Sequence, residues 1–597
     1  MTVTPRAMYL GPINRRSFAW VHTAEGESRG IGVVLCPPLG YEAILAHRPL
    51  RHLAERLATA GYPTVRLDYH GTGDSDGIDE QANRVEAWTA SIESAAEQLV
   101  ANGCSRIALY GLRAGALLAV VARRAHSPIA KDLLILHAPP NSGKAYIREL
   151  NAFHRLAAAS GLDDGTTQKQ DDRAIEAAGF VLWADTVEEL GAIEYAALEG
   201  TPARAALLLS REDSRGEDRI GDALIELGVA VTRRTPGDYA TMMQDPHKSI
   251  VPDAAWQDIV TWLNNQTTKL APPTHAEAPA DTPVFAVHIT SDRVSVSEVP
   301  TVRETAIRFG PEARLFGILS EPVLGAPSLV PVVLLNSGSV HRIGPNRLHV
   351  LWARAWASRG HLVLRMDIAG IGDSAVAVGR VENETYSQTA VEDVLAALAE
   401  LARRGAARPV LMGLCSGAYV AFHTARIAEL RGAVLMNPQT FDYRPGDPLD
   451  VSAAQRASQA TYYRRAALSG DKWKKLLKRE VDVSRVSQIV WERGREVVGM
   501  RLKNWVQRLR GGADSADGPL GDEVRRVAAR TRLAFIYSEG DPGLDYLDRN
   551  AEQTMMRLRE GHRIDFELIA GADHTFTPPS SQRRLFAVIS SWLERIH

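Results

Sequence analysis

The chain has 597 residues, too many for one hydrophobic core, so its length predicts about two to four domains. Hydrophobic residues make up 45% and charged residues 23% of the sequence, as in globular proteins, and a formal net charge of -2 gives no reason to expect a nucleic acid partner. The three cysteines, Cys36, Cys104 and Cys415, are widely spaced, which argues against a disulfide framework or a metal site and favours a reducing compartment.

The sequence shows no segment that would direct the chain to a membrane. Residues 1–6 carry no apolar signal core, and no stretch reaches the roughly 18 uninterrupted apolar residues of a membrane helix. We therefore expect a cytoplasmic protein without a membrane span. Nothing in the sequence indicates a cofactor or a metal.

The first part of the chain alternates between short apolar runs and longer amphipathic segments. Strands are predicted at Ile31–Cys36, Thr64–Leu67 and Ile107–Tyr110, with helices at Pro49–Ala60 and Val85–Leu99. This alternation, with strands rich in Val, Ile and Leu, predicts an α/β fold with a mostly parallel sheet covered on both faces. Ligands then belong at the carboxyl ends of the strands.

A tight turn is predicted where the strand at Ile107–Tyr110 meets the next helix. Gly111 and Gly115 frame the turn, because side chains there would collide with the neighbouring strand and helix. The residue at its tip is Arg113, whose guanidinium is permanently protonated and cannot attack an acyl group.

The second half of the chain repeats the order of elements in the first half. The segment Arg66–Ser75 recurs as Arg365–Ser374, and Gly111–Ala116 recurs as Gly413–Ala418. Near the end of each copy Asp213 corresponds to Asp541 and His247 to His574, at a larger spacing. One insertion therefore lies between the turn and the aspartate of the second copy.

In the second copy the turn Gly413-Leu414-Cys415-Ser416-Gly417 presents a cysteine at its tip. A thiol at a helix N-terminus is acidified by the helix dipole and by a nearby imidazole, so Cys415 could attack an acyl carbon as a thiolate. The alternative is a small, buried and inert cysteine between two glycines.

These turns, together with an Asp-x-x-Gly-x-Gly-x-Ser loop in each copy, resemble the α/β-hydrolase superfamily. The cysteine at the second tip is similar to that of dienelactone hydrolases and polyhydroxyalkanoate synthases. The resemblance covers nearly the whole chain and implies two tandem α/β-hydrolase domains, at 1–265 and 284–597. Between them the segment 266–283, rich in Pro, Ala and Thr, is predicted as a linker. The two caps of these domains are expected at 141–202 and 441–530.

The resemblance also implies a triad of nucleophile, acid and histidine in the order Cys415, Asp541 and His574. Asp541 matches the acid loop of the family, with Asp545 as a rival. The oxyanion hole is expected from the backbone N–H groups of Ser416 and Ser339, although the sequence around Ser339 departs from the usual His-Gly.

In the first domain the corresponding set is Arg113, Asp213 and His247, which lacks a nucleophile, so we expect no acyl chemistry there. Two roles remain open for Arg113. It binds a carboxylate or phosphate at the helix N-terminus, or it pairs with Asp213 or another acid and fills the vacated site.

Two basic segments have alternative interpretations. The segment His341–Arg347 either places cations near the mouth of the second pocket or forms a solvated loop. In the second cap, Lys472–Arg479 either docks an acidic carrier protein or the phosphates of coenzyme A, or is only the solvated face of a helix.

The favoured function is acyl transfer through an acyl-Cys415 intermediate, as a thioesterase or an acyltransferase. The expected substrate is an acyl thioester on an acyl carrier protein or coenzyme A. One alternative is hydrolysis of an ester or lactone, which the dienelactone hydrolase resemblance implies. A third hypothesis, prompted by the lost nucleophile of the first domain, is a binding or scaffold protein without catalysis.

Overall fold

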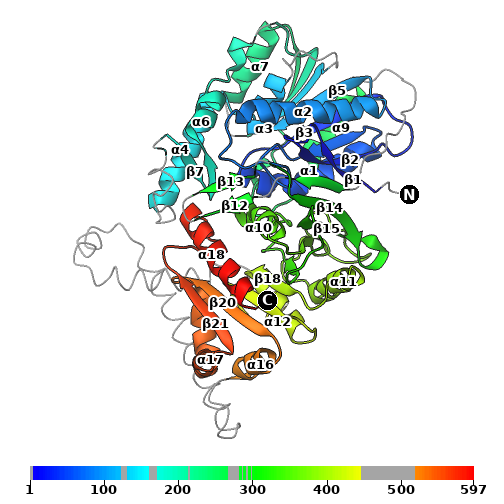
Figure 1. Cartoon of the computed structure of the whole chain (residues 1–597). Coiled ribbons are helices and arrows are strands. Elements are labelled where there is room, and N and C mark those ends of the chain that lie inside the picture. Colours follow the sequence, from blue (N-terminus) through cyan, green and yellow to red (C-terminus); the bar gives the residue numbers. More distant parts are fainter. Residues whose placement is uncertain are drawn as a thin grey trace, which may run out of the picture. The chain divides into compact units, whose positions relative to one another are not determined.

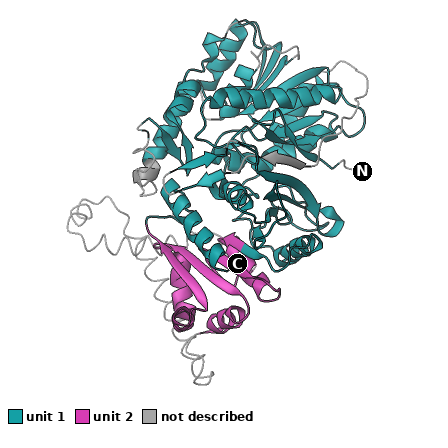
Figure 2. Cartoon of the chain, viewed as in Figure 1, with its two compact units in different colours: residues 1–411, 571–597 teal, residues 412–570 magenta. Residues whose placement is uncertain are grey.

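The computed structural model describes residues 4–122, 131–159, 171, 173–198, 200–212, 216–266, 281–284, 287–290, 293–297, 299–444 and 518–596 (Figure 1). The basic segment Lys472–Arg479, most of the predicted second cap, Asp213 and most of the predicted linker lie outside the described residues. The chain forms two compact units, a larger one of residues 1–411 and 571–597 and a smaller one of residues 412–570 (Figure 2). None of the described helices is long and apolar enough to cross a bilayer.

The first sheet has eight strands in the order β1-β2-β4-β3-β5-β6-β9-β10, all in the larger unit. The strands from β4 to β10 pair in parallel, and β1 and β2 add an antiparallel edge. The bounds are β1 Arg6–Leu10, β2 Ser17–His22, β3 Ile31–Cys36, β4 Thr64–Leu67, β5 Arg106–Leu112, β6 Leu133–His137, β9 Ala205–Leu209 and β10 Ala230–Arg234.

Helices cover both faces of this sheet, because its central strands are apolar on both sides. On β5, Ile107 and Leu109 pack with α2 and α3, whereas Ala108 and Tyr110 pack with α1 and α9 on the other face (Figure 1). The bounds of the helices and of a small hairpin are α1 Tyr41–Thr59, α2 Arg84–Ala101, α3 Ala114–Ala122, α4 Gly143–Ala159, β7 Ile175–Ala177, β8 Phe180–Leu182, α6 Ala184–Gly191, α7 Gly216–Glu226, α8 Tyr239–Met242 and α9 Asp253–Asn264.

The second sheet repeats this arrangement. In the larger unit its strands follow the order β11-β14-β15-β17-β16, and in the smaller unit β18-β19-β20-β21, with β18 beginning at the boundary. The strands are β11 Asp281–Val284, β14 Val302–Phe309, β15 Leu315–Pro322, β16 Val332–Leu334, β17 Val363–Asp367, β18 Val410–Leu414, β19 Gly432–Met436, β20 Arg532–Ser538 and β21 Ile564–Ile569, and β12 Val287–Ile289 pairs separately with β13 Val294–Val296. The helices are α10 Leu348–Ala357, α11 Ala390–Arg403, α12 Ser416–Ala425, α16 Pro519–Ala528, α17 Pro542–Glu560 and α18 Pro579–Arg595. Two mostly parallel sheets with helices confirm the predicted fold class.

The predicted elements of the first half coincide with the observed ones to within two residues, except for the start of the first helix. The prediction starts a helix at Pro49, whereas α1 runs from Tyr41 to Thr59 with Pro49 inside it. Because proline is favoured in the first turn of a helix, the prediction placed the start of this helix at Pro49, too late in the chain. Pro49 is among the buried residues of α1.

Within the larger unit, matching parts of the two repeats pack against each other. Phe18 and Trp20 of β2 form one apolar cluster with Phe316 and Ile318 of β15, and the rings of Trp20 and Phe316 lie 4.6 Å apart. The contact is therefore made by the same surface of each repeat, as in a two-fold symmetric dimer.

Reciprocal ion pairs follow the same symmetry. Arg66 of the first repeat pairs with Asp373 of the second, and Asp74 of the first pairs with Arg365 of the second. Arg342 lies between them and contacts Asp74 at 2.7 Å, Asp373 at 2.7 Å and Asp367 at 2.9 Å. Buried charges of opposite sign thus join the two repeats, and each depends on the others for compensation.

One buried carboxylate near this contact makes stability depend on pH. Both oxygens of Asp76 are buried and have no hydrogen-bond partner among the described residues. Burial raises the pKa of Asp76 to about 7, although Arg354 opposes the rise. This pKa is above that of an aspartate in the unfolded chain, so protonated Asp76 favours the folded state. Its contribution to stability is complete below about pH 4 and is lost as the pH rises to about 7.

Replacing Asp76 with asparagine is therefore expected to stabilise the protein by about 2–4 kcal/mol at pH 8 and to change little at pH 4. Denaturant unfolding at the two pH values measures the difference. Asp132→Asn is the contrasting control, because Asp132 is paired with Arg106 at 2.8 Å and its neutralisation should not stabilise at either pH. A gain from Asp76→Asn of equal size at both pH values would contradict the titration.

Candidate functional site

Cys415 occupies the tip of a sharp turn between β18 and α12. Its backbone has φ 57° and ψ -116°, a left-handed conformation that is uncommon for a residue with a side chain. The Cys415 N–H donates to the carbonyl of Met436 at 2.9 Å, and its own carbonyl accepts the N–H of Ala418 at 3.1 Å. Such strain, held by surrounding hydrogen bonds, is a feature of functional turns.

The glycine before this turn is required for space. A Cβ on Gly413 would lie 2.1 Å from the carbonyl carbon of Gly417, which no real side chain could accept. The first repeat shows the same crowding, since a Cβ on Gly111 would lie 2.4 Å from Cα of Ala116. Both glycines therefore serve the close packing of strand and helix that their pattern predicts.

The three cysteines differ in accessibility. Cys36 and Cys104 are buried, whereas Cys415 is partly exposed. Burial raises the pKa of Cys104 to about 12 and also raises that of Cys36, so both thiols stay protonated near neutral pH. The interpretation of Cys415 as a buried and inert cysteine is therefore not favoured.

Asp541 caps the N-terminus of α17. Its side chain is 4% exposed and accepts the N–H of Gly543 at 2.8 Å, whereas its rival Asp545 is exposed in the first turn of the helix. A Cβ on Gly543 would lie 2.2 Å from the carbonyl oxygen of Pro438, so the Asp541 loop packs against the segment that follows β19. Cys415 bonds to the last residue of the same strand. The smaller unit thus brings Cys415 and Asp541 to one edge of its sheet.

His574 lies in the larger unit, on the loop between β21 and α18, and is partly exposed. Asp573 fixes this loop by accepting the N–H and the hydroxyl of Thr577, each at 2.6 Å. The triad residues belong to different units, so their assembly with Cys415 and Asp541 stays a prediction.

The two residues expected in the oxyanion hole have different surroundings. Ser416 is the first residue of α12, where backbone N–H groups point out of the helix. Ser339 lies in a short loop after β16, where Ser337 and Val340 form a bridge, and its hydroxyl is 3.2 Å from that of Thr385. Their joint action on one oxyanion stays a prediction.

The segment His341–Arg347 is not a solvated loop, so that alternative is wrong. His341 stacks on His47 with ring centres 3.7 Å apart, and Arg342 enters the ion-pair cluster. The guanidinium of Arg347 donates to the carbonyl of Gly73 at 2.7 Å and to other carbonyls of the same first-repeat loop. The sequence could not reveal this, because the acceptors lie some 270 residues away in the chain.

In the first repeat Arg113 stands at the tip of the corresponding turn, with φ 56°. It is 5% exposed and donates to Glu42 at 2.9 Å and to Glu149. Burial would lower the pKa of Arg113, but these carboxylates raise it. Arg113 therefore pairs with acids, the second of the two alternatives, although its partners were not identified from the sequence.

Of the other two residues predicted at this vacated site, the structure describes only His247. Asp213 lies outside the described residues. His247 is half-buried in the loop between α8 and α9 and is not among the residues that line the cavity beside Arg113.

Comparisons with known families agree with the two sheets and the two turns. Residues 332–588 match the Alpha/beta hydrolase family, and residues 47–163 match the family described as Serine aminopeptidase, S33. The chain is a tandem α/β-hydrolase protein. No curated protein matches it.

Several solved structures resemble part of this tandem α/β-hydrolase. Each match covers almost the whole of the other protein but less than half of this chain. They include a putative hydrolase from Agrobacterium vitis S4, with 16% identity and a TM-score of 0.31. This match covers 44% of this chain and 98% of the hydrolase chain. A carboxyl esterase from Bacillus coagulans has 14% identity and a TM-score of 0.32, with 44% and 99% covered. Est1E from Butyrivibrio proteoclasticus has 15% identity and a TM-score of 0.31, with 43% and 99% covered.

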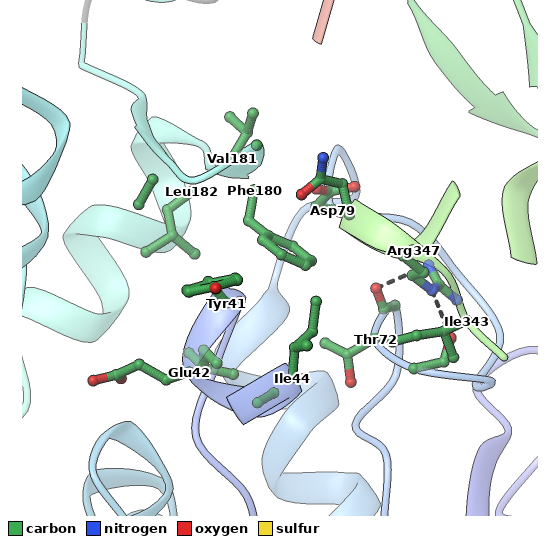
Figure 3. Close-up of a pocket in the computed structure, with 18 of the residues that line it drawn as sticks. Tyr41, Glu42, Ile44, Thr72, Asp79, Phe180, Val181, Leu182, Ile343 and Arg347 are labelled. Carbon is green, nitrogen blue, oxygen red and sulfur yellow. Dashed lines mark hydrogen bonds between the residues drawn. The ribbon is translucent and has the colours of Figure 1, made fainter. Parts of the chain in front are cut away.

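A cavity of about 470 Å³ opens beside Arg113 in the first hydrolase domain. Tyr41 and Ile44 of α1 and Phe180 and Leu182 of the β7–β8 hairpin line it, and Ile343 reaches it from the second domain (Figure 3). All of its lining residues belong to the larger unit. The cavity has the size of a small-molecule site, yet it lacks a nucleophile at the turn.

Proposed function

We propose that the second domain is a cysteine-dependent enzyme that transfers acyl groups through an acyl-Cys415 intermediate. The observation that carries this proposal is the strained turn that presents the partly exposed Cys415 at the N-terminus of α12. The family match over residues 332–588 supports hydrolase chemistry in this domain. A thiolate at that position is stabilised by the helix dipole.

In the proposed cycle the thiolate of Cys415 attacks the acyl carbon of a thioester. The N–H groups of Ser416 and Ser339 hold the oxyanion that forms. As the oxyanion collapses, the carbon–sulfur bond to the leaving thiol breaks and His574 supplies the proton. His574, oriented by Asp541, then takes a proton from water or another acceptor, which attacks the acyl group and releases Cys415.

A thioester is the preferred donor because exchange between two thioesters is nearly isoenergetic and keeps the acyl group activated. The acyl group would arrive on an acyl carrier protein or on coenzyme A. An oxygen ester or lactone is the alternative substrate. Comparing an acyl-pantetheine thioester with an oxygen ester of the same acyl group separates the two by their kcat/KM values.

Labelling with iodoacetamide followed by peptide mapping tests the nucleophile directly. We expect Cys415 to react at least about tenfold faster than Cys36 and Cys104, because both of these are buried and protonated. Prior incubation with an acyl thioester should protect Cys415. Equal labelling of the three cysteines in the folded protein would favour a scaffold without catalysis.

A further inference from the structure

The cavity in the first domain has two ends of different charge. At the Arg113 end, one guanidinium faces the carboxylates of Glu42 and Glu149. The second oxygen of Glu42 is buried and has no hydrogen-bond partner in the described part of the chain. This end therefore carries an excess of negative charge and repels an anion.

At the other end, Arg84 is buried and forms no ion pair with any described residue. Its side chain lies over the ring of Trp88, with the guanidinium carbon 5.0 Å from the ring centre. Arg84 is 2% exposed, its one hydrogen bond goes to the carbonyl of Ile78, and no described carboxylate forms an ion pair with it. Burial lowers the pKa of Arg84 to about 10, although Asp79, Asp185 and Glu189 raise it.

Arg347 adds a second cation at the same end. It is 5% exposed, and its hydrogen bonds go to backbone carbonyls, which are neutral. Both arginines meet at Gly71, since Arg347 donates to its carbonyl at 2.9 Å and a Cβ there would lie 1.9 Å from Nη1 of Arg84. Asp79 and Glu80 also line this end, and Glu80 accepts the N–H of Val294, but neither carboxylate forms an ion pair with Arg84 or Arg347 in the described structure.

Hydrogen bonds to carbonyls offset part of the cost of burying these two guanidiniums, but neither has an ion pair among the described residues, so an anion between them would stabilise both. Burial and repulsion by Arg354 lower the pKa of Arg347 to about 9, and Arg84 also lowers it, in spite of nearby Asp79. Proteins rarely bury such charge without a partner, and here both side chains line one cavity.

Apolar side chains separate the two ends. Figure 3 shows Tyr41, Ile44 and Phe180 between Glu42 on one side and Arg347 on the other. A ligand that spans this region would bury its apolar part against aromatic and aliphatic groups.

We propose that the first domain binds an organic anion in this cavity, with a carboxylate or phosphate head against Arg84 and Arg347 and an apolar body along Tyr41, Ile44 and Phe180. The site orients its ligand, because the head avoids the carboxylates of Glu42 and Glu149. It is distinct from Cys415 and does not depend on the proposed acyl chemistry.

Calorimetric titration of the full chain with octanoate, octyl phosphate, octanol and octylamine tests the head group. We expect one of the two anions to bind at least about tenfold more tightly than octanol, and octylamine to bind most weakly. Affinity should rise about fourfold for each methylene from butanoate to octanoate. The absence of binding by both anions, or preference for octylamine, would overturn the proposal.

Arg84→Met tests the role of the cation at similar side-chain length. We expect at least a tenfold loss of affinity for the preferred anion and no change for octanol, with partial recovery in Arg84→Lys. The melting temperature should not fall sharply, because the change removes a buried unpaired charge. Unchanged anion affinity in Arg84→Met would refute the site. The comparison of octanoate with octylamine uses the unaltered protein, so it tests the proposal even if this variant does not fold.

Two control variants locate the binding. Arg233→Met removes an exposed arginine that pairs with Asp222 and does not line the cavity, so it should bind the anion as the unaltered protein does. Cys415→Ala should also bind it normally, whether or not Cys415 is the nucleophile. Loss of anion binding in Cys415→Ala would place the ligand at the Cys415 turn and contradict the proposal.

Discussion

Replacing Cys415 with alanine is expected to abolish turnover of an acyl thioester while the chain remains folded. Loss of a covalent nucleophile typically lowers the rate by about 10³-fold or more. Arg113 occupies the tip of the first turn and is held by Glu42 and Glu149, so the first domain cannot compensate. Steady-state kinetics with acyl-pantetheine measures the loss.

The fold of this variant must be checked separately, because Cys415 has a strained backbone. A small side chain relieves crowding at the tip, so we expect a melting temperature near that of the unaltered protein. Activity retained in a folded Cys415→Ala protein would exclude the proposed mechanism. Cys415→Ser keeps the shape of the side chain but raises the pKa of the nucleophile by several units, so partial activity there would indicate that a general base assists the hydroxyl, the role predicted for His574.

The strands and the turns could be predicted from the sequence because their causes are local. Ile31–Cys36 is apolar throughout and forms β3, since both faces of a parallel strand are buried. Gly413 and Gly111 marked the two turns because only glycine fits where strand and helix nearly touch. A repeated pattern of such local features was enough to identify two domains of one fold.

The contacts between the repeats could not be predicted, because their partners are distant in the sequence. From the sequence alone Arg347 would be taken for a surface arginine. Only the folded structure shows that it donates hydrogen bonds to the carbonyls of Gly71 and Gly73. Likewise, Glu42 lies in the first turn of α1 and Glu149 in α4, both far from Arg113 in the sequence, so nothing local assigns them to Arg113. Burial of charge is decided by tertiary packing, which a single sequence does not reveal.

Arg342→Met is expected to lower the free energy of unfolding by about 3–5 kcal/mol. Arg342 is 1% exposed and pairs with Asp74, Asp367 and Asp373. Asp74 and Asp373 keep other cations in the variant, whereas Asp367 would be left with Asn336 and backbone N–H groups alone. Denaturant unfolding of the full chain measures the change.

Arg308→Met provides the matched control. Arg308 lies over the rings of Trp20 and Phe316 in the same region but forms no ion pair in the described structure, so its loss should cost about 1 kcal/mol or less. Arg342 also has a functional consequence, because it follows Ser339 by only three residues and anchors that loop to the first domain. If Ser339 contributes to the oxyanion hole, Arg342→Met should lower kcat at a temperature where the variant is still folded, while Cys415 remains reactive toward iodoacetamide. Equal unfolding energies for the two variants would show that the ion-pair cluster does not hold the repeats together.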